Sequence, residues 1–352
     1  MTYRVIQWGT GNVGKHSLRA IIGRPDLELV GLKVYSDSKV GVDAGDLVGG
    51  PKTGILAIKD VDRLLEIDAD VVVYNPLGVT LADLSPIVSD ICMLLSRGYN
   101  VASSAIETAI YPPALVPEVL DQIREACEKG KTSFLAGGIN PGFGMDLLPV
   151  YLSRLSRTIH QIRCLEVCDM VHYSSKANMM AMGFCQTPEQ LQGRGGRMVG
   201  RHPMPFYASL LMLADAYQFE LEAVRFETDY GYTDKPIEVA IGTIETGTAA
   251  VVKLRFIGEA YGRDVLVNEW VWRCSQDIKP EWGTGEYWSV EIKGDPELKL
   301  RLDASTEFDS KRNVSITVAT NVVNSIPGLC DSSPGVKSAL DLPICVGGMV
   351  TR

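Results

Sequence analysis

The stretch Arg4–Ile22, RVIQWGTGNVGKHSLRAII, decides the fold of the first part of this chain. Its opening residues form an apolar run typical of a buried β-strand, and the residues from Lys15 onward have the pattern of a helix. Between them lies Gly9–Gly14, a G-x-G-x-x-G segment. A strand, a glycine-rich turn and a helix in this order are the fingerprint of a dinucleotide-binding βαβ unit. We therefore expect a Rossmann-type parallel sheet.

Each glycine of this segment has its own physical role. Gly9 permits the tight turn, Gly11 lets the backbone approach a pyrophosphate, and Gly14 lets the helix pack close to the strand. Free N–H groups at the start of the helix then hold the pyrophosphate. The alternative is a strand–helix turn that binds nothing. The predicted cofactor-binding residues of the loop are Gly9, Thr10, Gly11, Asn12, Val13 and Gly14.

Bulk composition narrows the class of protein. A chain of 352 residues, 46% of them hydrophobic, is expected to bury a large core in two domains. A net charge of −9 disfavours nucleic acid and anionic membranes as partners. Eight scattered cysteines without a CxxC pair favour reduced thiols and no metal site. With no signal peptide and no long apolar run, we expect a cytoplasmic protein.

The first domain, residues 1–142, alternates short apolar strands with amphipathic helices, as parallel α/β sheets do. The expected strands are Arg4–Trp8, Leu27–Val34, Val71–Tyr74, Asn100–Ala102 and Ser133–Ala136. The expected helices are Lys15–Gly23, Val61–Glu66, Leu84–Arg97 and Pro117–Lys129.

The second domain, residues 143–315, begins with an expected helix, Phe143–Leu155, and an expected strand, Thr158–Tyr173. Residues 193–203, GRGGRMVGRHP, read as an exposed loop, and Phe206–Tyr217 reads as a helix. Strands in series joined by glycine-containing turns follow, which predicts an α+β domain with an open, mainly antiparallel sheet. Residues 316–352 are helical up to Pro327 and are expected to return to the first domain.

The loop after the second strand should select the cofactor, because it stands about 20 residues past the glycines. An acidic side chain there, such as Asp37, binds the ribose hydroxyls of NAD and repels a 2′-phosphate. Ser36 and Ser38 can donate hydrogen bonds to a phosphate, and Lys39 can supply a positive charge. We therefore expect NADP(H) to be preferred, with NAD(H) possible.

The chemistry should lie at the carboxyl ends of the strands. Cofactor contacts are expected there from Asn75, Pro76, Ser103 and Asn140. Glu107 is the sole carboxylate between Asn100 and Pro117, and apolar surroundings would raise its pKa and suit it to acid/base catalysis. The alternative is a helix-start or capping carboxylate with no catalytic role, because Ser104 to Glu107 fits the S-x-x-E pattern. The two interpretations stay open at this point.

A set of motifs resembles a known family. The segments WGTGNVG (8–14), VYSDSKVGVDAGDL (34–47), SSAIET (103–108), GGINPGFGMDLLP (137–149), VVNSIPG (322–328) and PGVKSALDLP (334–343) resemble the 2,4-diaminopentanoate dehydrogenases and the related native amine dehydrogenases that use NAD(P)H. The resemblance implies the fold of dihydrodipicolinate reductase. The motif typical of that enzyme's own substrate site is absent from the sequence, so its own reaction is not expected.

The resemblance also implies an activity. It is the reversible oxidative deamination of an amine to a ketone or aldehyde and ammonia, with Glu107 as the catalytic acid/base. An apolar substrate pocket would then include Phe143, Tyr173, His202 and Phe206, and a homodimer is expected to form through an apolar face of the open sheet. Two alternatives are kept: an ammonia-independent carbonyl or alcohol dehydrogenase, and an NADPH-binding sensor without catalysis.

Overall fold

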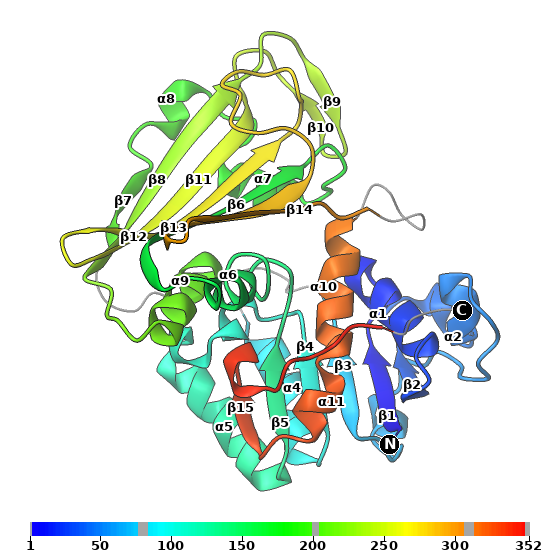
Figure 1. Ribbon diagram of the computed structural model, residues 1–352. Coiled ribbons are helices and arrows are strands. Elements are labelled where there is room, and N and C mark those ends of the chain that lie inside the picture. The colour runs from blue at the N-terminus through cyan, green and yellow to red at the C-terminus, as the bar shows by residue number, and fades with distance from the viewer. Residues whose placement is uncertain (1, 77–83, 199–203, 306–312, 349–352) are drawn as a thin grey trace. The chain divides into compact units, whose positions relative to one another are not determined.

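The computed structural model describes residues 2–76, 84–198, 204–305 and 313–348 (Figure 1). Contacts between Cα atoms divide the chain into two compact units. Unit 1 contains residues 1–143, 203–209 and 312–352, and unit 2 contains residues 144–202 and 210–311. The domain boundaries at 142/143 and 315/316 remain predictions.

Unit 1 is built on a parallel sheet whose six strands have the order β15-β5-β4-β3-β1-β2 among the described residues. The strands are β1 (Tyr3–Trp8), β2 (Leu27–Lys33), β3 (Val71–Tyr74), β4 (Asn100–Ser103), β5 (Ser133–Ala136) and β15 (Gly335–Lys337). The order reverses between β1 and β3, which makes their carboxyl ends the switch point where ligands bind in such sheets. Residues far apart in sequence thus meet, since β15 pairs with β5.

Helices cover both faces of this sheet. Their bounds are α1 (Asn12–Ile22), α2 (Ala44–Val48), α3 (Val61–Leu64), α4 (Ser85–Ser96), α5 (Pro117–Gly130), α10 (Asn313–Asn324) and α11 (Ile326–Cys330), with 3-10 turns η1 (Asp37–Lys39), η2 (Glu107–Ile110), η3 (Pro112–Ala114) and η4 (Ala339–Asp341). Val5 and Val73 share a core with Ile21 of α1 and Val322 of α10. Side chains alternate along a strand, so Tyr74 points to the other face and donates to Asp90 of α4 at 2.9 Å.

Unit 2 is built on a sheet with the strand order β14-β13-β6-β12-β11-β8-β7. Its pairs are antiparallel except β6 with β12, which confirms the predicted α/β class with a mainly antiparallel second sheet. The strands are β6 (Thr158–Asp169), β7 (Gly195–Met198), β8 (Ala223–Tyr232), β11 (Ala249–Ala260), β12 (Arg263–Arg273), β13 (Tyr287–Asp295) and β14 (Leu298–Leu302), with a separate hairpin of β9 (Ile237–Val239) and β10 (Gly242–Ile244). Its helices are α6 (Leu147–Ser153), α7 (Lys176–Met182) and α8 (Pro188–Leu191), and α9 (Pro205–Ala216) crosses the boundary of the units.

Several local predictions are wrong, each for a physical reason. Residues 195–198 form strand β7, not a loop, because they pair with β8. The helix expected from Phe143 starts at Leu147, where the Asp146 carboxylate accepts from the Leu147 N–H. The helix expected up to Pro327 is found but ends at Asn324, and Pro327 lies in the first turn of the separate helix α11.

One face of the second sheet carries ion pairs, contrary to the apolar face expected for dimerisation. Arg255 pairs with Glu227 at 3.0 Å and with Asp229 at 2.7 Å. Arg225 pairs with Glu259 at 2.6 Å and with Asp264 at 2.9 Å. The two arginine side chains are about one-third exposed, so a partner surface would have to match charges rather than cover apolar groups. The homodimer remains a prediction.

Within the described residues, we find no helix that is both long and apolar enough to cross a membrane.

We predict that Gly14→Ala destabilises unit 1, whereas Gly11→Ala does not to the same degree. A Cβ at Gly14 would lie 2.3 Å from the Gly9 carbonyl oxygen, whereas a Cβ at Gly11 would meet no atom within 4 Å. Gly14→Ala should lower the free energy of unfolding by about 1–3 kcal/mol or more, measured by denaturant titration. Gly11→Ala should cost at most about 1 kcal/mol; equal losses would contradict this packing.

Candidate functional site

The glycine loop has the shape of a dinucleotide cradle. Gly9 has φ +96°, in the left-handed region, and a Cβ there would lie 3.4 Å from the backbone of Asn75 and Pro76. Gly11 is the N-cap of α1 and makes no side-chain capping bond, and the space beside its Cα is open. An uncapped helix N-terminus beside open space fits a pyrophosphate, which backbone N–H groups and the helix dipole attract.

A buried glutamine, Gln7, forms hydrogen bonds that hold this loop in place. The Gln7 side-chain amide donates to the Gly9 carbonyl at 2.8 Å and to the Asn75 Oδ1 at 3.0 Å. Asn75 in turn donates to the Ser104 hydroxyl at 2.9 Å. The ends of β1, β3 and β4 are thereby linked by side chains. Sequence reasoning missed Gln7, although a polar residue inside an apolar strand was a signal for it.

The selector loop, residues 35–39 after β2, contacts the glycine loop directly. Lys39 Nζ donates to the Thr10 carbonyl at 2.9 Å and to its hydroxyl at 3.0 Å. Burial, and then the positive charge of Lys15, lower the pKa of Lys39. Two lysines therefore stand close to the start of α1, where an anion would relieve their mutual repulsion.

Asp37 points away from that cation. Its carboxylate pairs with Lys59 at 2.7 Å, and its side chain is 92% exposed. The hydrogen bond from Lys59 lowers the pKa of Asp37. Ser36 and Ser38 share a hydrogen bond of 2.8 Å between their hydroxyls. The selector loop thus presents two serine hydroxyls and Lys39, while its one carboxylate, Asp37, is paired with Lys59.

The turn after β4 carries Glu107. Ile106, Thr108 and Ala109 are buried, whereas Glu107 is exposed, so the expected apolar surroundings are not found around it. The helix η2 begins at Glu107 with Ile106, not Ser104, as its N-cap, so the S-x-x-E capping box does not form, but Glu107 does stand at a helix start. The hydroxyl of Ser103 is buried and bonded within the protein, donating to the Tyr74 carbonyl at 3.1 Å.

The turn after β5 carries Asn140, whose two side-chain polar atoms are buried. Neither finds a hydrogen-bond partner among the described residues. A Cβ at Gly142 would meet the Gly138 backbone, and one at Gly138 would meet the Pro141 carbonyl, so neither glycine borders open space. Asn321 of α10 fixes the turn by donating to the Gly138 carbonyl at 2.7 Å. A buried, unpaired amide is costly and suggests a ligand that would pair with it.

The predicted substrate-pocket residues are distributed over both units. Phe143 and Phe206 belong to unit 1 and are half-buried. Tyr173 belongs to unit 2, is exposed, and its hydroxyl accepts from the Asn178 side chain at 3.0 Å. His202 lies outside the described residues. The pocket remains a prediction.

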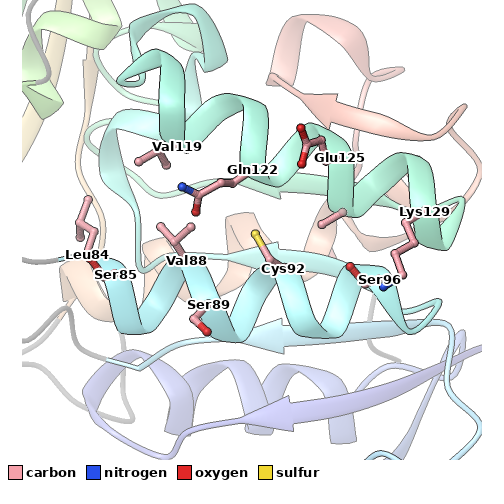
Figure 2. Close-up of a pocket in the computed structure, with 11 residues that line it drawn as sticks. Leu84, Ser85, Val88, Ser89, Cys92, Ser96, Val119, Gln122, Glu125 and Lys129 are labelled. Carbon is pink, nitrogen blue, oxygen red and sulfur yellow. The ribbon is translucent and has the colours of Figure 1, made fainter.

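A groove of about 570 Å³ lies between helices α4 and α5 (Figure 2). Val88 and Cys92 of α4 face Val119 and Gln122 of α5 across it. Burial, and then the charge of Glu125, raise the pKa of the Cys92 thiol, which keeps the thiol protonated and unreactive. None of the predicted site residues lines this groove.

Sequence comparisons find relatives over nearly the whole chain. A family model described as the 2,4-diaminopentanoate dehydrogenase C-terminal domain matches residues 143–351. An amine dehydrogenase of Streptomyces virginiae is 29% identical over 351 residues, covering 96% of this chain and 96% of that protein. A 2,4-diaminopentanoate dehydrogenase of Acetoanaerobium sticklandii is 27% identical over 352 residues, covering 97% and 93%.

Solved structures share the fold. The amine dehydrogenase from Mycobacterium smegmatis has a TM-score of 0.77 at 19% identity, covering 98% of this chain and 97% of that one. A dipicolinate-bound dihydrodipicolinate reductase from Paenisporosarcina sp. TG-14 has a TM-score of 0.50 at 15% identity, covering 97% and 99%. These similarities confirm the predicted fold.

Proposed function

Because the chain belongs to the 2,4-diaminopentanoate dehydrogenase C-terminal domain family, which confirms the resemblance seen in its motifs, we propose that it is an NAD(P)H-dependent amine dehydrogenase. In the proposed reaction, an amine, water and oxidised cofactor give a ketone or aldehyde, ammonia, reduced cofactor and a proton. The observation that carries the proposal is the family match over residues 143–351, which covers unit 2 and the C-terminal part of unit 1 with β15.

The residues of unit 1 fit a nicotinamide dinucleotide. Its pyrophosphate would be held by Gly9–Gly14 and the first turn of α1, where the space beside Gly11 is open. Its carboxamide would pair with the buried amide of Asn140. When bound, the nicotinamide supplies the hydride donor or acceptor. Asn75 and Pro76 border the same loop, and Ser103 supports it through Tyr74.

We favour NADP(H) over NAD(H) because of the charges in the selector loop. Lys39 is a cation that lies near the like charge of Lys15, and Ser36 and Ser38 add hydroxyl donors. Asp37, whose charge would repel a 2′-phosphate, is neutralised by Lys59. Its exposed ion pair contributes little to stability, so Asp37 can also turn back to a ribose diol, which leaves NAD(H) possible.

Glu107 is proposed as the acid/base. It stands directly after β4 on a turn anchored by the buried Ile106 and Thr108, so its backbone is fixed while its carboxylate is accessible. In deamination its carboxylate would take a proton from the water that attacks the iminium carbon. It would then return a proton to the departing ammonia. The reverse sequence performs reductive amination.

The substrate walls are proposed to include Phe143, Tyr173 and Phe206, whose rings would exclude water from the imine. His202 is also proposed to line the substrate pocket. Partners are a small amine or carbonyl compound and ammonia, and a homodimer is proposed as the assembly.

We predict that carbonyl reduction depends on ammonium. Ketones and aldehydes should oxidise NADPH in the presence of ammonium, followed by absorbance at 340 nm, with amine product detected by mass spectrometry. Turnover of the same rate without ammonium would instead identify a carbonyl or alcohol dehydrogenase. Binding of NADPH without turnover of any carbonyl would point to a sensor.

We predict that Glu107→Gln lowers kcat by about 10²–10⁴-fold and leaves the Kd for NADPH unchanged, because the amide cannot exchange the proton. Glu118→Gln, at an exposed position in the first turn of α5, is the matched control and should keep wild-type kcat. A Glu107→Gln variant with wild-type turnover would remove Glu107 from the mechanism.

We predict that Lys39→Ala raises the Kd for NADPH at least about tenfold, as expected for a lost hydrogen bond to a charged group, and barely changes that for NADH. Because the pKa of Lys39 is lowered, its charge is complete below that pKa and disappears as pH rises through it. NADPH affinity should therefore fall at a lower pH than an ordinary lysine would give, and Lys39→Arg should abolish this dependence. Lys52→Ala, at an exposed lysine, is the control; equal changes for both cofactors would contradict the assignment.

A further inference from the structure

Resting on the proposed cofactor, we propose that Tyr35 is the platform on which the adenine ring stacks. Tyr35 lies two residues after β2 and is the first residue of the selector loop, at the carboxyl ends of the strands. It is 53% exposed, although it is a large aromatic residue next to the fully buried Val34.

The exposed ring is held in a defined orientation. The Trp8 indole N–H donates to the Tyr35 hydroxyl at 3.0 Å. The same hydroxyl interacts with Tyr74, whose own hydroxyl donates to Asp90. One end of the ring is therefore anchored on a buried aromatic pair, because Trp8 and Tyr74 lie with ring centroids 6.1 Å apart.

A cation fixes one face of the ring. Lys33 Nζ lies 4.9 Å from the ring centroid of Tyr35, within the range of a cation–π contact. Lys33 is itself pinned, since it donates to the Lys59 carbonyl at 2.7 Å and to the Val34 carbonyl at 3.2 Å. With its hydroxyl and one face engaged, Tyr35 is still 53% exposed over the whole residue.

A fixed, open aromatic face suits a flat heteroaromatic ligand. Stacking on such a face needs no further ordering of the side chain, so less conformational entropy is lost on binding. The strand order shows which end of the dinucleotide this is. Tyr35 follows β2, whereas Glu107 and Asn140 follow β4 and β5. β2 and β4 are three strand spacings apart, or about 14 Å, so the ring at Tyr35 is the adenine and not the nicotinamide.

The test measures binding of each half of the cofactor to the full-length protein by titration calorimetry. The probes are NADPH, NADH, 2′,5′-ADP for the adenosine half and reduced nicotinamide mononucleotide for the other half. Tyr35→Ala should raise the Kd for 2′,5′-ADP, NADPH and NADH about tenfold and leave the mononucleotide unchanged. Tyr35→Leu, which keeps bulk without the π face, should behave as Tyr35→Ala, and Tyr35→Phe should stay within about threefold of wild type.

Tyr261→Ala, at an exposed tyrosine in the β11–β12 turn, is the matched control and should bind every probe as wild type does. Wild-type affinity of Tyr35→Ala for 2′,5′-ADP overturns the platform. So does an equal loss for the mononucleotide, which would indicate collapse of the loop. If wild type binds none of the probes, the platform and the cofactor proposal both fail. If 2′,5′-ADP binds in a Tyr35-dependent way but no ammonium-dependent turnover occurs, the platform stands and the amine dehydrogenase proposal fails.

Discussion

The close approach of helix α1 to strand β1 is the constraint on which the cofactor site depends. Gly14 lies so near the Gly9 carbonyl that a single methyl group would not fit between them. This contact places the uncapped start of α1 beside the switch point of the sheet. Gln7 then ties the glycine loop to Asn75, and Lys39 ties it to the selector loop. The anion-binding geometry is thus a product of backbone packing.

The proposed site extends along the carboxyl ends of the parallel strands, and other side chains hold each of its parts in place. Trp8 and Lys33 hold Tyr35 at the β2 end. Asn321, which comes from helix α10 far along the chain, fixes the turn of Asn140 at the β5 end. The residues expected to contact ligand are small, polar or partly exposed, and the residues that support them are buried. Such division lets a rigid scaffold present adaptable contacts.

The sequence predicted unit 1 closely and unit 2 less so. Apolar runs of four residues in unit 1, such as Val71–Tyr74, can pair their backbone groups and bury their side chains only as central parallel strands. The ends of these strands could therefore be predicted from the sequence. Strand β7 could not be predicted from the sequence, because Gly195–Met198 is polar and glycine-rich and becomes a strand only by pairing with β8. The ion pairs of Arg225 and Arg255 likewise depend on cross-strand register, which composition does not encode.

By itself, the sequence determined the glycine loop, the alternation of strands and helices, and the position of the selector loop, because each depends on local spacing and backbone sterics. Tertiary structure alone decided where the charges point. Asp37 faces Lys59, and Lys39 faces Thr10, because residues distant in sequence become neighbours only in the folded sheet. It also decided that Tyr35 is anchored yet exposed and that the buried amide of Asn140 has no hydrogen-bond partner within the part of the chain that the structure describes. Burial and hydrogen-bond pairing are properties of packed surfaces, and no single segment contains them.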